Sequence, residues 1–162
     1  MHVVRDTREQ KGFAFTAFPD VIVEDGTLQS GDYSLKGLEN KIAVERKSLD
    51  DLIMSISRDR DRFCRELDRA KGLESFVILC EGRWSDLVHG RYKSKMNPAS
   101  AVSTVAAIMA RRGVPVFFAE SREQAEQFVV KLLRMYLTGK EREAQAIQQA
   151  LTDNGTGSKM LS

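Results

Sequence analysis

Two carboxylates and a lysine around one short predicted strand are the residues of this sequence best suited to chemistry. Asp32 precedes one short apolar segment, and Glu45 and Lys47 lie in and after the next one. Because side chains alternate along a strand, Glu45 and Lys47 share one face, while Val44 and Arg46 share the other. Mg²⁺ prefers carboxylate oxygens, and a bound divalent metal activates water and neutralises charge on a phosphate. The pattern therefore predicts metal-dependent hydrolysis of a phosphodiester.

The two short segments must form a hairpin if these groups are to meet. Residues 33–35 and 42–44 are predicted to be strands, and the polar residues 36–41 between them suit a turn. An antiparallel pairing would bring Asp32 to the face that carries the glutamate and the lysine. Ser48 then lies at the junction with the next helix, where its hydroxyl can accept a hydrogen bond from an amide of the first turn.

A longer pattern around these residues resembles a known signature. The segments are Gly31-Asp32-Tyr33, Val44-Glu45-Arg46-Lys47 and Asp51-Leu52. Together they are similar to the signature of the XPF-type (XPF/Mus) structure-specific endonucleases, a branch of the PD-(D/E)xK nuclease superfamily. The similarity begins in the first predicted strand, continues through the strand at Phe76–Gly82, and covers roughly residues 3–136. It implies an α/β fold with a restriction-endonuclease-like mixed central sheet flanked by helices.

The resemblance also implies roles for individual residues. Asp32 and Glu45 would bind Mg²⁺ or Mn²⁺, assisted by a backbone carbonyl next to Glu45. Lys47 would orient or activate the attacking water. The implied substrate is DNA, with flaps, forks and other branched structures as candidates. The remaining residues of the implied site are Asp6, Arg8, Arg46 and Asp51.

Each of these four supporting residues also has a structural explanation. Asp6 and Arg8 can pair with one another at the end of the sheet. Arg46 can pair with Asp51, and Asp51 can also favour the first turn of a helix through the helix dipole. The sequence leaves a structural and a catalytic role open for these residues.

Charge offers only local evidence for DNA binding. The net charge is +2 and the isoelectric point is about 8.6, so the overall balance does not establish nucleic-acid binding. Arg91, Lys93 and Lys95 lie in one predicted loop without an intervening acid, where they can hold phosphate or form ordinary surface charge. Arg62 fits the family pattern. His89 is expected to be a solvated loop residue.

Composition predicts one globular domain. The chain has 162 residues, of which 42% are hydrophobic and 30% are charged, enough for a core of ordinary size. It has no long apolar stretch and no basic-then-apolar start. We therefore expect no membrane contact and an intracellular location in the cytoplasm or nucleoid, or in the host cytoplasm if a phage encodes it. Cys64 and Cys80 lack the spacing of a disulfide framework or a zinc site.

Apolar periodicity predicts alternating strands and helices. Five short apolar runs near residues 3–4, 21–23, 42–44, 76–80 and 116–118 are predicted strands. Apolar residues at helical spacing predict helices over residues 49–70 and around Val102, Val105, Ala106 and Met109. A final helix from Arg122 carries one apolar stripe: Ala125, Phe128, Val129, Leu132, Leu133 and Tyr136.

The predicted organisation is a nuclease domain over residues 1–137 and a polar helical extension over residues 138–162. The extension is expected to lose structure from Thr152 onward. The stripe on the helix at 122–137 can pack on the core or form a homodimer. No segment here is long enough for the helix-hairpin-helix module that related enzymes carry, which leaves branched-DNA specificity open.

Two classes of function fit these patterns. The favoured one is a Mg²⁺- or Mn²⁺-dependent DNA endonuclease, with branched DNA, four-way junctions or single strands as possible substrates. The other is a non-catalytic DNA-binding or scaffold subunit. Such proteins lose the acidic site, whereas this chain keeps Asp32, Glu45 and Lys47.

Overall fold

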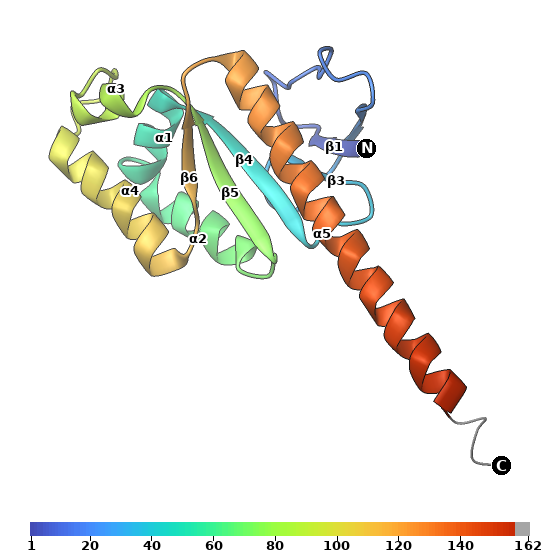
Figure 1. The fold of residues 1–162 in the computed structure, drawn as a ribbon. Coiled ribbons are helices and arrows are strands. Elements are labelled where there is room, and N and C mark those ends of the chain that lie inside the picture. The colour runs from blue at the N-terminus through green and yellow to red at the C-terminus, as the bar shows by residue number, and fades with distance from the viewer. Residues whose placement is uncertain (158–162) are drawn as a thin grey trace.

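A computed structural model describes residues 1–157 as a six-stranded sheet with helices on both faces (Figure 1). The strands lie in the order β2-β1-β3-β4-β5-β6. The strands are β1 (His2–Asp6), β2 (Ile22–Gly26), β3 (Tyr33–Leu35), β4 (Ile42–Ser48), β5 (Ser75–Glu81) and β6 (Val116–Ala119). The helices are α1 (Leu49–Ile56), α2 (Arg60–Ala70), α3 (Trp84–Val88), α4 (Pro98–Arg112) and α5 (Arg122–Gly157).

The sheet is mixed, which confirms the predicted fold class. β1 pairs with β2 in parallel and with β3 in antiparallel orientation, and β4, β5 and β6 run parallel to one another. β3 and β4 form the expected antiparallel hairpin, with Tyr33 opposite Val44. Gly31 enters this hairpin with a φ of +77°, and a Cβ built on it would lie 2.9 Å from the Ala43 side chain and 3.0 Å from the Val44 carbonyl oxygen. Only glycine therefore suits this position, directly before Asp32.

Two cores lie on the two faces of the sheet. α1, α2 and α4 cover one face of β4–β6, and α5 covers the other (Figure 1). Alternation along β4 sends Ala43 to the first core, whereas Ile42 and Val44 enter the second. Glu45 and Lys47 continue the row of Ala43, so they lie on the face that carries α1 and α2.

The structure refines two of the helix predictions. The helices predicted over residues 49–70 are α1 and α2, and α1 ends at Ile56, where the hydroxyl of its C-cap, Ser57, donates to the Ile53 carbonyl at 2.6 Å. On α4 the buried residues are Ala101, Val105 and Ile108, whereas Met109 is 46% exposed. The apolar residues surround much of this helix, so the sequence pattern did not reveal which row faces the core.

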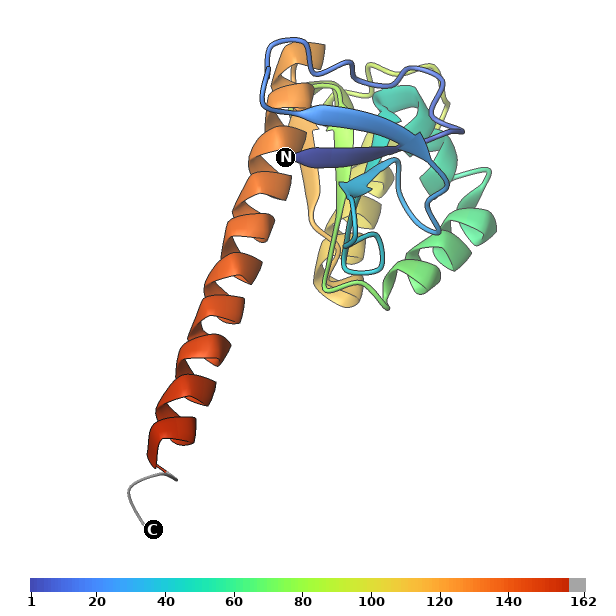
Figure 2. The same cartoon turned by 90° about the vertical axis from the view of Figure 1, so that its right-hand side faces the viewer.

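α5 is one continuous helix of 36 residues (Figure 2). Its first half packs on the sheet through Ala125, Val129 and Leu133 of the predicted stripe, and through Val130, which the stripe did not include. The second half projects away from the body, and residues 141–154 are exposed (Figure 2). The helix extends to Gly157, so the expected loss of structure at Thr152 is wrong up to that residue, and residues 158–162 lie outside the described part.

Cys64 and Cys80 are both free thiols, as expected from their spacing. Among the residues that the structure describes, no helix combines the length and the apolar character needed to cross a membrane.

Candidate active site

Asp32 is fixed between β1 and β4 by its own backbone. Its amide donates to the Val44 carbonyl at 2.8 Å, and its carbonyl accepts from the Asp6 amide at 2.8 Å. The Asp32 carboxylate also accepts from the Arg46 amide, with an Oδ2···N distance of 2.7 Å. The hairpin therefore holds this carboxylate beside the backbone of β4, as the sequence predicted.

Glu45 and Lys47 meet on the same face of β4. The Lys47 ammonium donates to Oε1 of Glu45 at 2.8 Å, and each side chain is only 11% exposed. Lys47 Nζ also lies 5.2 Å from the centroid of the Phe63 ring on α2. The lysine is thus held between a carboxylate and an aromatic face, which limits the directions in which it can point.

Burial controls the electrostatics of the site. It raises the pKa of both Asp32 and Glu45, and the charge of Asp32 raises the pKa of Glu45 further. Burial alone would lower the pKa of Lys47, but the charges of Glu45 and Glu66 outweigh it and raise the pKa. Lys47 is therefore an ammonium group at neutral pH and a poor general base.

The carboxylates fit a hard divalent cation. Lys47 is the one side-chain cation that bonds to Glu45 in the described part of the chain. The raised pKa values of Asp32 and Glu45 show that burial disfavours their negative charge, which a bound cation would stabilise. Mg²⁺ takes one or two protein carboxylates and completes its shell with water and substrate phosphate. Within residues 1–157, no group of three or more His, Cys, Asp or Glu side chains is placed to hold a metal ion.

Asp6 and Arg8 pair with one another, as the structural explanation predicted. Arg8 donates to the Asp6 carboxylate through Nε at 2.7 Å and through Nη2 at 2.9 Å. The same carboxylate accepts from the amides of Arg8 and Leu28 at 2.9 and 2.7 Å. Asp6 is 2% exposed, and its acceptor sites are occupied by Arg8, in the loop after β1, and by Leu28, in the loop after β2.

Arg46 lies on the opposite side of β4 from Lys47. Its Nε donates to Glu81 at 2.6 Å, and its Nη1 lies 3.5 Å from Glu9. The predicted pairing with Asp51 is therefore wrong. Asp51 instead accepts from the Ser48 hydroxyl at 2.6 Å, and its amide donates to the same hydroxyl at 3.1 Å. The expected N-cap of α1 is confirmed.

Three acidic residues near the site were missed in the sequence. Glu9 and Glu81 flank Arg46, and Glu66 on α2 contributes negative charge to the surroundings of Asp32, Glu45 and Lys47. Glu9 stands in the same segment as Asp6 and Arg8, so its position was a usable signal. For Glu66 the signal was weaker, one helical turn after Phe63 in a segment of mixed charge.

The candidate phosphate-binding residues are exposed side chains on α2 and in the loop after α3. Arg62 on α2 is 74% exposed and lies 3.3 Å from Asp59. Arg91 donates to Asp86 at 2.6 Å, and Lys93 is 91% exposed, 3.7 Å from Asp50. The Lys93 amide donates to Asp50 at 2.9 Å, which attaches this loop to the start of α1. Lys95 is exposed, and Nδ1 of His89 lies 2.7 Å from the Ser85 carbonyl.

Comparison with known proteins relates this geometry to a family. The ERCC4 domain matches residues 5–132. The structure of XPF from Aeropyrum pernix is 24% identical with a TM-score of 0.67, over 84% of this chain and 61% of that one. A second structure, XPF from Aeropyrum pernix in complex with DNA, gives the same identity and TM-score over 85% and 66% of the two chains. This chain therefore spans less than two thirds of either.

At this identity the likeness to the solved structures concerns the fold. No match was found among the curated proteins. The ERCC4 domain match, in contrast, covers most of the chain and includes β3 and β4, on which the candidate site is built. The protein belongs to the ERCC4 domain family.

Proposed function

We propose that this protein is a divalent-metal-dependent DNA endonuclease that hydrolyses phosphodiester bonds. The observation that carries the proposal is the meeting of Asp32, Glu45 and Lys47 on one side of the β3–β4 hairpin, with both carboxyl pKa values raised by burial. The family supports nuclease chemistry, and the similar fold of a protein solved in complex with DNA supports DNA as the substrate.

Asp32 and Glu45 would hold Mg²⁺ or Mn²⁺, assisted by the backbone carbonyl next to Glu45. The metal would supply an activated water and neutralise charge that develops on the phosphate. Lys47 would orient the attacking water and stabilise negative charge as a fixed ammonium group, a role that its raised pKa favours over proton abstraction. Arg46 and Asp6 would act from outside the reacting groups, because their charged ends contact other parts of the fold.

The proposed substrate is DNA with flaps, forks or other branches, cut beside a junction between single and double strands. Arg62, Arg91, Lys93 and Lys95 would contact phosphates around the site, an interaction that reads no sequence and weakens with salt. A scaffold without activity is the alternative from another class. The retention of both carboxylates and the lysine favours the enzyme.

A homodimer through residues 122–137 of α5 is a further part of the proposal. The core uses Ala125, Val129 and Leu133 of this helix, so they are not available to a partner. Phe128 lies at the edge of the packed face, where it stacks on Phe117 with ring centroids 4.0 Å apart. Phe117 is 41% exposed, and this aromatic pair would form the apolar part of the dimer contact.

Cleavage of end-labelled DNA tests the enzyme directly. Duplex, single-stranded, flap, fork and four-way DNA would be incubated with Mg²⁺, Mn²⁺ or EDTA. We expect metal-dependent cutting that disappears in Asp32→Ala and Glu45→Ala. Lys47→Ala should lower turnover while DNA binding persists, and Asp61→Ala, at an exposed position on α2, is the matched control with wild-type activity.

Two results would contradict the proposal. Cutting by Asp32→Ala at the wild-type rate would remove the metal site from the mechanism, because a metal-binding carboxylate cannot be silent in it. DNA binding by the wild-type protein without cutting in either metal would favour the scaffold.

A further inference from the structure

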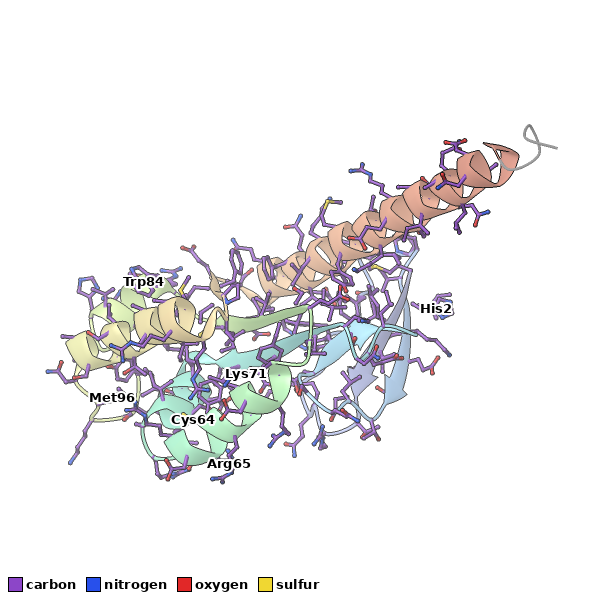
Figure 3. All side chains as sticks on the ribbon, turned by 90° about the horizontal axis from the view of Figure 1, so that it is seen from below. His2, Cys64, Arg65, Lys71, Trp84 and Met96 are labelled. Carbon is purple, nitrogen blue, oxygen red and sulfur yellow. The ribbon has the colours of Figure 1, made fainter. Side chains whose placement is uncertain are left out.

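Trp84 is the one tryptophan of the sequence, and its side chain is not buried. It opens α3, three residues after Glu81 ends β5, and is 46% exposed. Figure 3 shows it at the α3 end of the molecule, away from His2. A tryptophan is usually among the most buried residues of a domain, so an exposed one at the edge of a candidate active site needs a reason.

The Trp84 ring is positioned by an aromatic contact. It meets Phe118 of β6 with ring centroids 5.3 Å apart and an interplanar angle of 77°. Such a T-shaped contact restricts the orientation of the indole, and 46% of the residue stays exposed. The aromatic group is therefore positioned, yet able to receive a flat partner.

The sheet relates Trp84 to the candidate active site. Lys47 of β4 lies opposite Cys80 of β5, and Cys80 lies opposite Phe118 of β6. The three residues form one row across parallel strands, so their side chains share the same face of the sheet. Two strand spacings, about 10 Å, separate Lys47 from Phe118 along this row. Phe118 in turn contacts Trp84, so the indole lies within a few nucleotides of Lys47, since adjacent bases in one strand are about 3.4 Å apart or more.

Charges of both signs lie in the segments next to Trp84. Arg83 precedes it and is exposed, and Arg91 and Lys93 belong to the loop after α3. Asp86 lies 2.6 Å from Arg91, and Asp50 lies 3.7 Å from Lys93. Phosphates that displaced these acids would find the cations already in position.

We propose that Trp84 stacks on an unpaired base of the DNA strand that enters the active site. This inference rests on the proposed function and names part of its substrate. Bases within a duplex stack on one another, so a flat protein ring can reach a base only in a single strand or at an opened junction. Stacking of this kind tolerates any sequence, because every base has a π face. Trp84 would therefore select DNA with a single strand next to the phosphate that is cut.

The single tryptophan allows a direct test without cleavage. Indole emission would be measured in EDTA while an unlabelled 12-nucleotide thymidine strand, or a blunt 20-base-pair duplex, is added. Fluorescein-labelled copies of both would report affinity by anisotropy in separate samples. We expect the single strand to quench the emission strongly and the blunt duplex to leave it nearly unchanged, although both bind.

Three variants separate stacking from folding. Trp84→Ala should weaken binding of the single strand by about 5- to 150-fold, the range measured for one stacked base, while duplex affinity stays the same. Trp84→Phe should retain most of the affinity, because a ring remains. Ile147→Ala removes an exposed apolar side chain from the projecting half of α5, outside both the candidate site and the proposed dimer contact, so it should bind the single strand as the wild type does.

The outcomes distinguish this inference from the proposed function. If the wild type cuts DNA with metal but the single strand neither quenches Trp84 nor depends on it, the inference fails and the nuclease stands. If the protein neither binds nor cuts any DNA, both fail. If the emission shifts with protein concentration in the absence of DNA while the mass doubles by light scattering, Trp84 lies in a contact between copies, which also overturns the inference.

Discussion

Substitution of Asp6 should lower the stability of the protein much more than its chemistry. In the folded protein this carboxylate accepts from the Arg8 side chain and from the amides of Arg8 and Leu28. It contacts neither Glu45 nor Lys47 through any of these bonds. Only its backbone amide reaches the candidate site, through the Asp32 carbonyl, and a side-chain substitution leaves that bond intact.

The expected loss of unfolding free energy in Asp6→Ala follows from the amides that lose their hydrogen-bond acceptor. In Asp6→Ala the buried Leu28 amide and the Arg8 amide lose their partner, and an unsatisfied buried group costs about 1–3 kcal/mol. The Arg8 side chain is 69% exposed and can bind water instead. We expect a loss of about 2–4 kcal/mol in the free energy of unfolding, or about 4–16 °C in Tm. Asp6→Asn keeps one acceptor oxygen and should lose about half as much.

The pH dependence gives the prediction a second signature. Burial raises the pKa of Asp6, but the Arg8 side chain and the amides of Leu28 and Arg8 outweigh it and lower the pKa overall. A lowered pKa means that this group stabilises the fold above its unfolded pKa, near 4, and loses that contribution as the pH falls through the folded value. The stability gap between wild type and Asp6→Asn should therefore close below about pH 4.

Urea unfolding, followed by circular dichroism from pH 3 to 8, measures the gap, and cleavage well below Tm measures the chemistry. We expect Asp6→Asn to keep its turnover within a few-fold of the wild type. The opposite pattern, wild-type unfolding with cleavage lost by orders of magnitude, would refute the structural assignment and place Asp6 among the reacting groups.

Three further predictions concern charge, metal and helix capping. Arg46→Met leaves Glu9 without its paired cation and leaves Glu81 with Arg122 alone, at 3.4 Å, so it should cost about 3–5 kcal/mol in urea unfolding. Adding Glu81→Gln should recover part of this loss, and equal stability of wild type and Arg46→Met would contradict the ion network. Because the pKa of Asp32 is raised in the fold, the wild type in EDTA should lose stability relative to Asp32→Asn as the pH rises from 5 to 8. For the same reason Mg²⁺ should raise the wild-type Tm more at pH 8 than at pH 6. A stability difference between wild type and Asp32→Asn that does not change with pH would refute the buried charge. Ser48→Ala should cost about 1 kcal/mol through loss of the α1 cap, and Ser48→Thr should not.

The parts that sequence predicted best depend on local rules. The strict alternation along β4 placed Glu45 and Lys47 together, and the turn residues between 36 and 41 placed Asp32 beside them. Both inferences need only a strand and a hairpin. The N-cap at Ser48 is equally local, since donor and acceptor lie three residues apart.

The parts that failed depend on contacts between distant segments. Arg46 binds Glu81, 35 residues away, and the sequence contains many acids that could have served. Glu66 approaches the site only because α2 folds back beside β4, which places Phe63 against Lys47. For a related reason, the sequence did not show which residues of α4 face the core. Its apolar residues surround the helix, and packing against α1 and α3 selects Ala101, Val105 and Ile108.

The interior position of β4 has a consequence for how the protein loses activity on heating. This strand pairs with β3 at Val44 and with β5 along all seven of its residues, in unbroken register. Amides in such a strand exchange with solvent only when the whole domain opens, whereas a loop that is attached by a few bonds opens at much lower cost. The segment that carries Glu45 and Lys47 therefore unfolds only together with the rest of the domain. The segment of Arg91 and Lys93 can unfold locally. Moderate heating should therefore weaken DNA binding first, while the hydrolytic groups stay in place until global unfolding.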